Sequence, residues 1–282
     1  MKIAFKTLGC RVNLYETDAL ASRFKEAGYD IVDTSEDADV FVVNTCTVTN
    51  QSDQKCRQAL HQIRRQHPNS LIVATGCMVN HRKNELLEKK TVDYAIDNER
   101  KYALFTIINN HFKGEAVDPE GLDIDLFGYQ PAFDTFHTRS LIKIHDGCNN
   151  FCSYCLIPMV RGRATSRNDK DIYDNIRKVV DHGFKEIVLT GIETCSYQYG
   201  LADLIDKLTE IDGIERIRLS SVNPAFIKPK FIDRIKDNKK FCPHFHLSLQ
   251  SFCDKTLNAM RRQYNTRMIK ENCAYIRSVM KN

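Results

Sequence analysis

Three cysteines lie close together near the middle of the chain, at Cys148, Cys152 and Cys155. Cysteine thiolates are the preferred ligands of iron–sulfur clusters. Three thiolates in one short loop can bind three irons of a [4Fe–4S] cube and leave the fourth iron open to a small chelating ligand. A zinc knuckle is the alternative, but zinc would need a fourth protein ligand and a different spacing. The loop therefore predicts an iron–sulfur cluster with one open iron.

A second set of cysteines is dispersed along the first third of the chain, at Cys10, Cys46 and Cys77. Each follows an apolar segment that is typical of a β-strand. Because the carboxyl ends of parallel strands meet at one edge of a sheet, we expect these three thiols to converge. The alternative is that they are small packing residues of the core, as free cysteines often are. The other five cysteines have no ligand spacing and are expected to be packing residues: Cys56, Cys195, Cys242, Cys253 and Cys273.

Alternating strands and helices are expected to position the dispersed set. The predicted strands span residues 3–8, 39–43 and 70–75, and the predicted helices span residues 14–27, 52–66 and 79–89. Such alternation indicates a mostly parallel sheet with helices on its faces. We therefore predict an α/β fold, with a doubly wound parallel-sheet domain over residues 1–112 that carries the dispersed cysteines.

A different composition separates this part from the rest of the chain. Residues 113–138 combine glycines and prolines with several acidic residues, which predicts an acidic linker. Over residues 139–282, the predicted strands span 141–145, 186–190, 214–219 and 245–249, and the predicted helices span 169–182, 201–211, 229–237 and 267–280. Only about four βα units are present, so this domain is predicted to be a partial (β/α) barrel.

Composition limits the class of protein. The 282 residues are 42% hydrophobic and 27% charged, as in a folded protein. Neither a signal peptide nor a membrane-spanning apolar run is seen, so we expect a cytoplasmic protein without a membrane partner. Eleven cysteines are then more consistent with metal or catalytic use than with disulfides. The net charge of +5 permits a nucleic-acid partner without requiring one.

Several motifs together resemble the radical S-adenosylmethionine methylthiotransferases, which replace a C–H bond with a C–S–CH3 group. The motifs of the first domain are Leu8-Gly9-Cys10-Arg11-Val12-Asn13, Asn44-Thr45-Cys46-Thr47-Val48 and Gly76-Cys77-Met78-Val79. Those of the second domain are Asp146-Gly147-Cys148, Ile157-Pro158, Arg161-Gly162-Arg163, Leu189-Thr190-Gly191, Arg218-Leu219-Ser220-Ser221 and His246-Leu247-Ser248-Leu249-Gln250-Ser251. The residues around Cys10 and Cys46 most resemble the branch that acts on N6-threonylcarbamoyladenosine at position 37, next to the tRNA anticodon.

The resemblance implies two [4Fe–4S] clusters and S-adenosylmethionine as cofactors. Cys148, Cys152 and Cys155 would hold the cluster that binds S-adenosylmethionine and yields a 5′-deoxyadenosyl radical. Cys10, Cys46 and Cys77 would hold an auxiliary cluster that presents sulfur to C2 of the adenine. The partners would be the anticodon region of tRNA and an electron donor such as flavodoxin or ferredoxin. The candidate residues for binding S-adenosylmethionine are Tyr154, Glu193, Ser221, Gln250 and Ser251.

Other readings of the residues stay open. Tyr154 is equally well an ordinary loop aromatic, strand-end polar residues are common surface features, and no catalytic residue is identified. Arginines after the cysteine loop are expected to hold RNA, whereas those on the helix over residues 52–66 are expected to form a solvated face. The arginines after the cysteine loop are Arg161, Arg163 and Arg167. Those on the helix are Arg57, Arg64 and Arg65.

The chain also departs from the family pattern. The resemblance implies a longer chain, so we expect the radical domain to be incomplete at its C-terminus and a C-terminal RNA-binding domain to be missing. Phe252 stands where the family usually has glycine, and Asn223 stands where this branch often has glutamate. The alternative functions are methylthiolation of an isopentenyl-type adenosine in tRNA or of a ribosomal-protein aspartate, and a degenerate, non-catalytic iron–sulfur protein.

Overall fold

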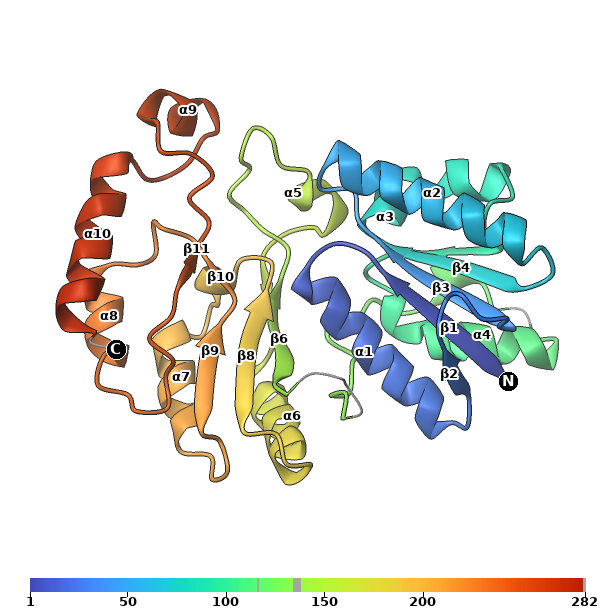
Figure 1. Cartoon of the computed structure of the whole chain (residues 1–282), viewed down its shortest axis with the longest axis horizontal. Coiled ribbons are helices and arrows are strands. Elements are labelled where there is room, and N and C mark those ends of the chain that lie inside the picture. The colour runs from blue at the N-terminus through green and yellow to red at the C-terminus, as the bar shows by residue number, and fades with distance from the viewer. Residues whose placement is uncertain (116, 134–137, 281–282) are drawn as a thin grey trace. The chain divides into compact units, whose positions relative to one another are not determined.

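The computed structural model describes residues 1–115, 117–133 and 138–280 (Figure 1). These residues form two compact units, each with its own sheet. Unit 1 comprises Met1–Thr135 and Met159–Arg161, and unit 2 comprises Phe136–Pro158 and Gly162–Asn282. The short segment Met159–Arg161 therefore belongs to unit 1, although its neighbours in the sequence belong to unit 2.

Unit 1 is built on a five-stranded parallel sheet with the strand order β2-β1-β3-β4-β5. The strands are β1 (Lys2–Thr7), β2 (Asp30–Val32), β3 (Val40–Thr45), β4 (Leu71–Gly76) and β5 (Tyr94–Ile96). Every residue of β3 and β4 is buried. Continuous apolar strands of this kind are typical of a parallel sheet that is covered on both faces.

Helices cover both faces of this sheet, as Figure 1 shows: α1 and α4 lie on one face, and α2 and α3 lie on the other. The helices are α1 (Arg11–Glu26), α2 (Asn50–Gln66), α3 (Cys77–Glu88) and α4 (Leu104–Lys113), with 3-10 turns η1 (Lys101–Ala103) and η2 (Pro119–Gly121). Thr49 caps α2 by accepting a hydrogen bond from the Ser52 amide at 3.0 Å. Gly114 ends α4 in the left-handed conformation that glycine favours.

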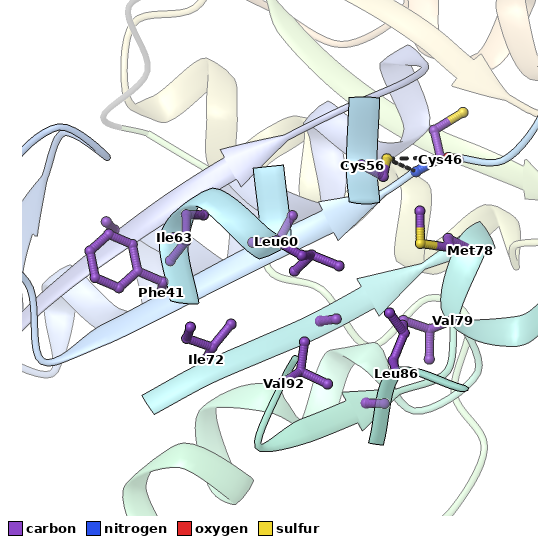
Figure 2. Close-up of a cluster of buried hydrophobic side chains, with 14 of the residues drawn as sticks. Phe41, Cys46, Cys56, Leu60, Ile63, Ile72, Met78, Val79, Leu86 and Val92 are labelled. Atoms are coloured by element: carbon purple, nitrogen blue, oxygen red, sulfur yellow. Dashed lines mark hydrogen bonds between the residues drawn. The ribbon is translucent and has the colours of Figure 1, made fainter. Parts of the chain in front are cut away.

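The core between the sheet and helices α2 and α3 is apolar (Figure 2). Leu60 and Ile63 of α2 and Leu86 of α3 pack with Phe41 and Ile72 of the central strands. Fully burying such a side chain contributes about 1.5–3 kcal/mol relative to leaving it exposed. This core fixes the strands whose carboxyl ends precede Cys46 and Cys77.

Unit 2 contains a four-stranded sheet of order β7-β6-β8-β9 and a parallel pair, β10 with β11. The strands are β6 (Ser140–Asp146), β7 (Thr165–Ser166), β8 (Glu186–Gly191), β9 (Arg216–Leu219), β10 (Ser221–Val222) and β11 (His246–Leu247). Strands β6, β8 and β9 are parallel to one another, whereas β7 pairs antiparallel with β6.

Helices connect these strands in a partial-barrel pattern. They are α5 (Ile157–Val160), α6 (Asp169–Asp181), α7 (Leu201–Thr209), α8 (Pro229–Ile235), α9 (Asp254–Ala259) and α10 (Thr266–Val279), with the 3-10 turn η3 (Thr194–Ser196). The first of them, α5, has its last two residues in unit 1. Helix α6 packs on β6, α7 packs beside α8, and α8 packs beside α10. Side chains of Asn168 and Asn265 cap α6 and α10.

The observed architecture confirms the predicted fold class, an α/β sheet domain followed by a partial barrel. The sequence pattern missed the short edge strands β2 and β5, which have three residues each. It also missed helix α4, whose Leu104, Ile107 and Ile108 are buried.

Candidate iron–sulfur sites

Cys10, Cys46 and Cys77 each follow one of three adjacent strands of unit 1. Cys46 comes directly after β3 and Cys77 directly after β4, where it is the first residue of α3. Cys10 lies three residues after β1 and is the N-cap of α1. Because β1, β3 and β4 are neighbours and parallel, the three cysteines lie at one edge of the sheet.

Two glycines allow the three loops to approach one another closely. Gly9 has φ +108°, and a Cβ built on it would lie 2.7 Å from Cys46 Cβ and 2.9 Å from Cys46 Sγ. Gly76 has φ +97°, and a Cβ there would clash with the carbonyl oxygen and amide nitrogen of Thr45. A larger residue at either position would therefore need both a strained backbone and movement of its neighbour.

The three thiols differ in their exposure to solvent. Cys46 and Cys77 are buried, and Cys10 is exposed. Burial raises the pKa of the Cys46 thiol, a backbone hydrogen bond at Val48 opposes this, and the nearby Cys77 and Cys10 thiolates raise the pKa further. Burial and like charge thus both disfavour a thiolate at Cys46, and a positively charged iron bound there would favour it.

Cys56 lies beside this set, and its thiol is hydrogen-bonded to the backbone of Cys46. Its Sγ accepts a hydrogen bond from the Cys46 amide and donates one to the Cys46 carbonyl, both at 3.2 Å. Burial raises the pKa of the Cys56 thiol to about 11. In Figure 2 the Cys46 side chain points away from Cys56, so Cys56 supports the Cys46 backbone while Cys46 Sγ remains available as a ligand.

A buried polar network holds the backbone of two of these loops. The side-chain nitrogen Nδ2 of Asn13 donates to the backbone carbonyl of Leu8 at 2.7 Å and to that of Thr45 at 2.9 Å. Leu8 precedes the Gly9-Cys10 turn and Thr45 precedes Cys46. Arg161 Nη2 in turn donates to Asn13 Oδ1 at 2.5 Å, which fixes the orientation of that amide.

Glu16 is the central carboxylate of the same network. It accepts from Lys101 Nζ at 2.6 Å and from the two terminal nitrogens of Arg161 at 2.8 and 3.1 Å. All three side chains have no exposed surface. Burial lowers the pKa of Lys101, and the Glu16 carboxylate opposes that change. Buried charges of this kind persist only when they are paired and hydrogen-bonded.

The prediction that Arg161 and Arg167 hold RNA is therefore wrong. Arg161 is 2% exposed and Arg167 is 5% exposed, so neither guanidinium can reach a phosphate. Arg167 bonds within unit 2. Its two terminal nitrogens, Nη2 and Nη1, donate to the side-chain oxygen of Asn175 at 2.6 and 2.8 Å. Arg163 lies over the Phe151 ring, 4.6 Å from the ring centroid.

The second cysteine set lies in unit 2, on the loop that follows β6. Gly147 begins the loop with φ +66°, and a Cβ there would clash with the carbonyl oxygen of Arg163. The Cys155 amide donates to the Cys152 carbonyl at 3.0 Å, and the Asn150 amide points at Cys148 Sγ at 3.5 Å. Burial is the main cause of the raised pKa of both Cys148 and Cys155, and neighbouring cysteine thiolates raise each further.

Of the predicted cofactor-binding residues, Tyr154 is part of this loop, Glu193 contacts it, and Ser221 pairs with His246. Glu193 Oε2 accepts from Asn150 Nδ2 at 2.9 Å, which brings Glu193 to the cysteine loop, and from Asn223 Nδ2 at 3.2 Å. Tyr154 is 46% exposed. Ser221 Oγ lies 2.9 Å from His246 Nδ1, across the β10–β11 pair.

The remaining two lie in the turn after β11. Gln250 has φ +60°, and Ser251 Oγ accepts from the Cys253 amide at 3.2 Å. Phe252, which stands where the family usually has glycine, is not among the described residues with positive φ, so a bulky residue there carries no left-handed backbone strain. Cys253 is exposed, which makes the prediction of a packing role wrong for this cysteine.

Sequence reasoning missed Arg262, which donates from Nη1 to Cys152 Sγ at 3.3 Å. It also missed Asn150 and Tyr264, the partners of Glu193 and of Arg262. Asn150 could have been found because it lies within the cysteine loop. Arg262 and Tyr264 follow the loop by more than a hundred residues and carry no spacing signal.

The donor sets fit iron–sulfur clusters better than single metal ions. Among the residues that the structure describes, no group of three or more His, Cys, Asp or Glu side chains is arranged to hold one metal ion. Each cysteine of a cube binds a different iron, so cube ligands are spread more widely than the ligands of one ion. Two sets of three thiols, one at a sheet edge and one in a loop, suit iron–sulfur chemistry.

Comparisons with known proteins define the class and then the family. Residues 142–282 match the radical SAM superfamily, and residues 2–97 match a family described as uncharacterized protein family UPF0004. A radical SAM domain implies one [4Fe–4S] cluster and S-adenosylmethionine. Together with the relatives described next, these matches show that the chain belongs to the radical S-adenosylmethionine methylthiotransferase family, as its motifs predicted.

The relatives include three kinds of methylthiotransferase. The threonylcarbamoyladenosine tRNA methylthiotransferase MtaB of Aquifex aeolicus is 37% identical over 98% of this chain and 69% of its own length, and that of Bacillus subtilis is 38% identical over 93% and 60%. A tRNA-2-methylthio-N(6)-dimethylallyladenosine synthase of Syntrophus aciditrophicus is 32% identical over 93% and 60%. The ribosomal protein uS12 methylthiotransferase RimO of Caldicellulosiruptor saccharolyticus is 33% identical over 99% and 66%. The chain thus spans roughly two thirds or less of the length of most of these relatives.

A solved structure shares the fold. The radical S-adenosylmethionine methyltransferase TsrM from Kitasatospora setae matches with a TM-score of 0.67 over 99% of this chain and 66% of its own, at 14% sequence identity. At that identity the likeness concerns the fold alone.

Within the described residues, no helix has the length and apolar character needed to cross a membrane.

Proposed function

We propose that this protein is a tRNA methylthiotransferase that adds a methylthio group to C2 of N6-threonylcarbamoyladenosine at position 37. The observation that carries the proposal is the gathering of Cys10, Cys46 and Cys77 at one sheet edge of unit 1, in addition to the cysteine loop of unit 2. Sulfur insertion needs a second cluster besides the one that binds S-adenosylmethionine. We assign that auxiliary cluster to residues 1–112 and the radical chemistry to residues 139–282.

Each set of residues has a role in this proposal. Cys148, Cys152 and Cys155 would hold a cluster with one open iron, and Cys10, Cys46 and Cys77 would hold the other. When bound, the first cluster and S-adenosylmethionine supply the one-electron chemistry that breaks an unreactive C–H bond. The chain orients these groups, with Tyr154, Glu193, Ser221, Gln250 and Ser251 as the candidate contacts to S-adenosylmethionine.

The choice of substrate rests on the relatives. Relatives named as threonylcarbamoyladenosine enzymes are 32–38% identical, and those named for dimethylallyladenosine or for ribosomal protein uS12 are 30–33% identical. We infer that tRNA is the partner and that a cytoplasmic flavodoxin or ferredoxin supplies the electron. Methylthiolation of another tRNA adenosine or of a ribosomal protein is the second candidate, supported by the small size of that difference in identity.

Two measurements test the proposal. The anaerobically reconstituted and reduced protein should cleave S-adenosylmethionine to 5′-deoxyadenosine, and a Cys148→Ala variant should not. A bacterial strain that lacks its threonylcarbamoyladenosine methylthiotransferase should regain the methylthio nucleoside when it expresses this chain, as measured by mass spectrometry of tRNA digests. Cleavage without any change in that nucleoside would refute the substrate, and a lack of cleavage would refute the radical chemistry.

A further inference from the structure

Arg262 makes a contact with the cysteine loop that the motifs do not predict. Its Nη1 donates to Cys152 Sγ at 3.3 Å. Arg262 lies just after helix α9, and its amide bonds to the Leu257 carbonyl at 2.9 Å. The preceding Arg261 has φ +58°, so the chain turns sharply here. Arg262 and Cys152 both belong to unit 2.

Further contacts fix the orientation of the Arg262 guanidinium. Its Nε donates to Tyr264 Oη at 2.9 Å, and its Nη2 donates to the Ser248 carbonyl at 3.1 Å. The single proton of the Tyr264 hydroxyl is shared between the carbonyls of Ser248 and Leu249, which lie at 3.0 and 2.9 Å. Tyr264 is only 4% exposed, and the guanidinium carbon lies 4.9 Å from its ring centroid. The planar fork of arginine is therefore held in one position.

The cysteine loop is tied to the same part of the fold by a second pair of bonds. Ser153, next to Cys152, donates from its amide to the Met260 carbonyl at 3.2 Å and from Oγ to the Ala259 carbonyl at 2.7 Å. These bonds hold the loop against the turn that carries Arg262. The short distance from Arg262 to Cys152 Sγ is thus built into the backbone arrangement of unit 2.

The positive charge of Arg262 affects the reduction potential of an iron–sulfur cluster bound by Cys152. Arginine is not deprotonated in proteins, so the group that donates to Cys152 Sγ is a cation. A cationic donor bonded to a thiolate forms a charge-assisted hydrogen bond, which is stronger than a neutral one. Hydrogen bonds to the sulfur ligands are among the factors that set the reduction potential of an iron–sulfur cluster.

We propose that Arg262 is a positioning residue of the radical cluster: it raises the reduction potential by its hydrogen bond to Cys152 Sγ and fixes the cysteine loop relative to the segment that leads to Gln250 and Ser251. The inference rests on the proposed function in one respect, namely that Cys148, Cys152 and Cys155 hold a [4Fe–4S] cluster. Withdrawal of electron density from one ligand makes the cluster easier to reduce, which the cleavage of S-adenosylmethionine requires.

The test is a redox titration of the anaerobically reconstituted full chain, followed by electron paramagnetic resonance. Added S-adenosylmethionine changes the signal of the cluster that binds it and so distinguishes that cluster from the auxiliary cluster. We expect Arg262→Gln to shift the midpoint potential of that signal to a more negative value. At a fixed potential, the ratio of reduced to oxidised cluster should fall about tenfold, the effect of losing one charge-assisted hydrogen bond.

Matched variants separate this role from general charge and from folding. Arg261→Gln removes the same charge from the adjacent, exposed residue and should leave the potential unchanged. Tyr264→Phe removes one of the bonds that orient Arg262 and should give a smaller shift in the same direction. Arg262→Lys keeps a cation without the fork and should give an intermediate potential, which preserves the test if Arg262→Gln binds no iron.

The outcomes distinguish the two proposals. A wild-type potential in Arg262→Gln or in Arg262→Lys, with normal iron content, would overturn the role of Arg262 alone. An equal shift in Arg261→Gln would also overturn it, because the effect would then be one of net charge. A wild-type chain that shows no signal responsive to S-adenosylmethionine would refute the proposed function itself.

Discussion

Glu16 offers a sharp test of the buried network in unit 1. Replacing Glu16 by Gln removes the carboxylate that pairs with both Lys101 and Arg161, two cations whose side chains are fully buried. Breaking a buried ion pair by removing one partner costs about 3–5 kcal/mol. A cost of this size is a large part of the total stability of an ordinary domain, about 5–15 kcal/mol.

Native-state hydrogen exchange of the apo protein measures this cost in unit 1 itself. The amides of β3 and β4 are buried at the centre of the sheet and should exchange through large opening events. A loss of 3 kcal/mol or more lowers their protection factors by on the order of a hundredfold or more. Exchange is preferable to a single unfolding curve because the chain has two units and no tryptophan.

Glu85 provides the matched control. Its carboxylate also binds two cations, Arg82 at 3.0 Å and Lys89 at 2.8 Å, but it lies at the surface. Exposed ion pairs contribute little because water and salt screen them. Glu85→Gln should therefore leave the protection of β3 and β4 almost unchanged. If Glu16→Gln and Glu85→Gln had equally small effects, the buried network would not stabilise unit 1 as we infer.

Three further predictions follow from the sites. Gly9→Ala should prevent cluster assembly at Cys46, because the new Cβ would overlap that side chain, whereas Gly28→Ala, also at positive φ but in open space, should keep its iron; iron quantitation after reconstitution measures this. Cys56→Ala should lower the free energy of unfolding by about 1–2 kcal/mol, seen as a lower melting temperature, through the loss of buried sulfur and of two hydrogen bonds. The apo protein should become less stable as the pH falls from 6.5 to about 4, because burial lowers the pKa of His145 to about 4 and only the unfolded chain takes up the proton in that range. The loss in the free energy of unfolding is at most about 3 kcal/mol. Urea titrations measure it, and His145→Gln should flatten the pH dependence.

Each of these predictions has a contrary result. Equal iron in Gly9→Ala and wild type would show that the loops around Cys46 are more widely spaced than the structure indicates. An unchanged melting temperature in Cys56→Ala would show that its hydrogen bonds contribute nothing. A pH profile that is the same with and without His145 would exclude that residue, and leave Lys143 and Asp146, which pair at 2.5 Å next to it, as the groups to examine.

The placement of the cysteines in the fold could be predicted because its signals are local. Each dispersed cysteine follows an apolar strand, and the parallel sheet places strand ends together for reasons that hold for any such fold. The loop cysteines lie within eight residues of one another, so their proximity depends on no tertiary contact. Long, strongly apolar strands such as β3 and β4 were also found, because burial on both faces requires continuous apolar residues.

Features that depend on tertiary contacts could not be predicted in this way. Arg161 looked like an exposed phosphate ligand, but its partner Glu16 is 145 residues away in the sequence. Arg262 reaches Cys152 across 110 residues. Strands β2 and β5 are too short to show a period and are specified mainly by pairing with their neighbours.

Iron and acid-labile sulfide quantitation on the anaerobically reconstituted protein tests the two-cluster assignment most directly. We expect about eight irons per chain in the wild type, four for each cube. Cys46→Ala should retain about four, and Cys253→Ser, which changes an exposed cysteine outside both sets, should match the wild type. A wild-type chain with about four irons, or a Cys46→Ala variant that loses none, would contradict the assignment of a second cluster to Cys10, Cys46 and Cys77.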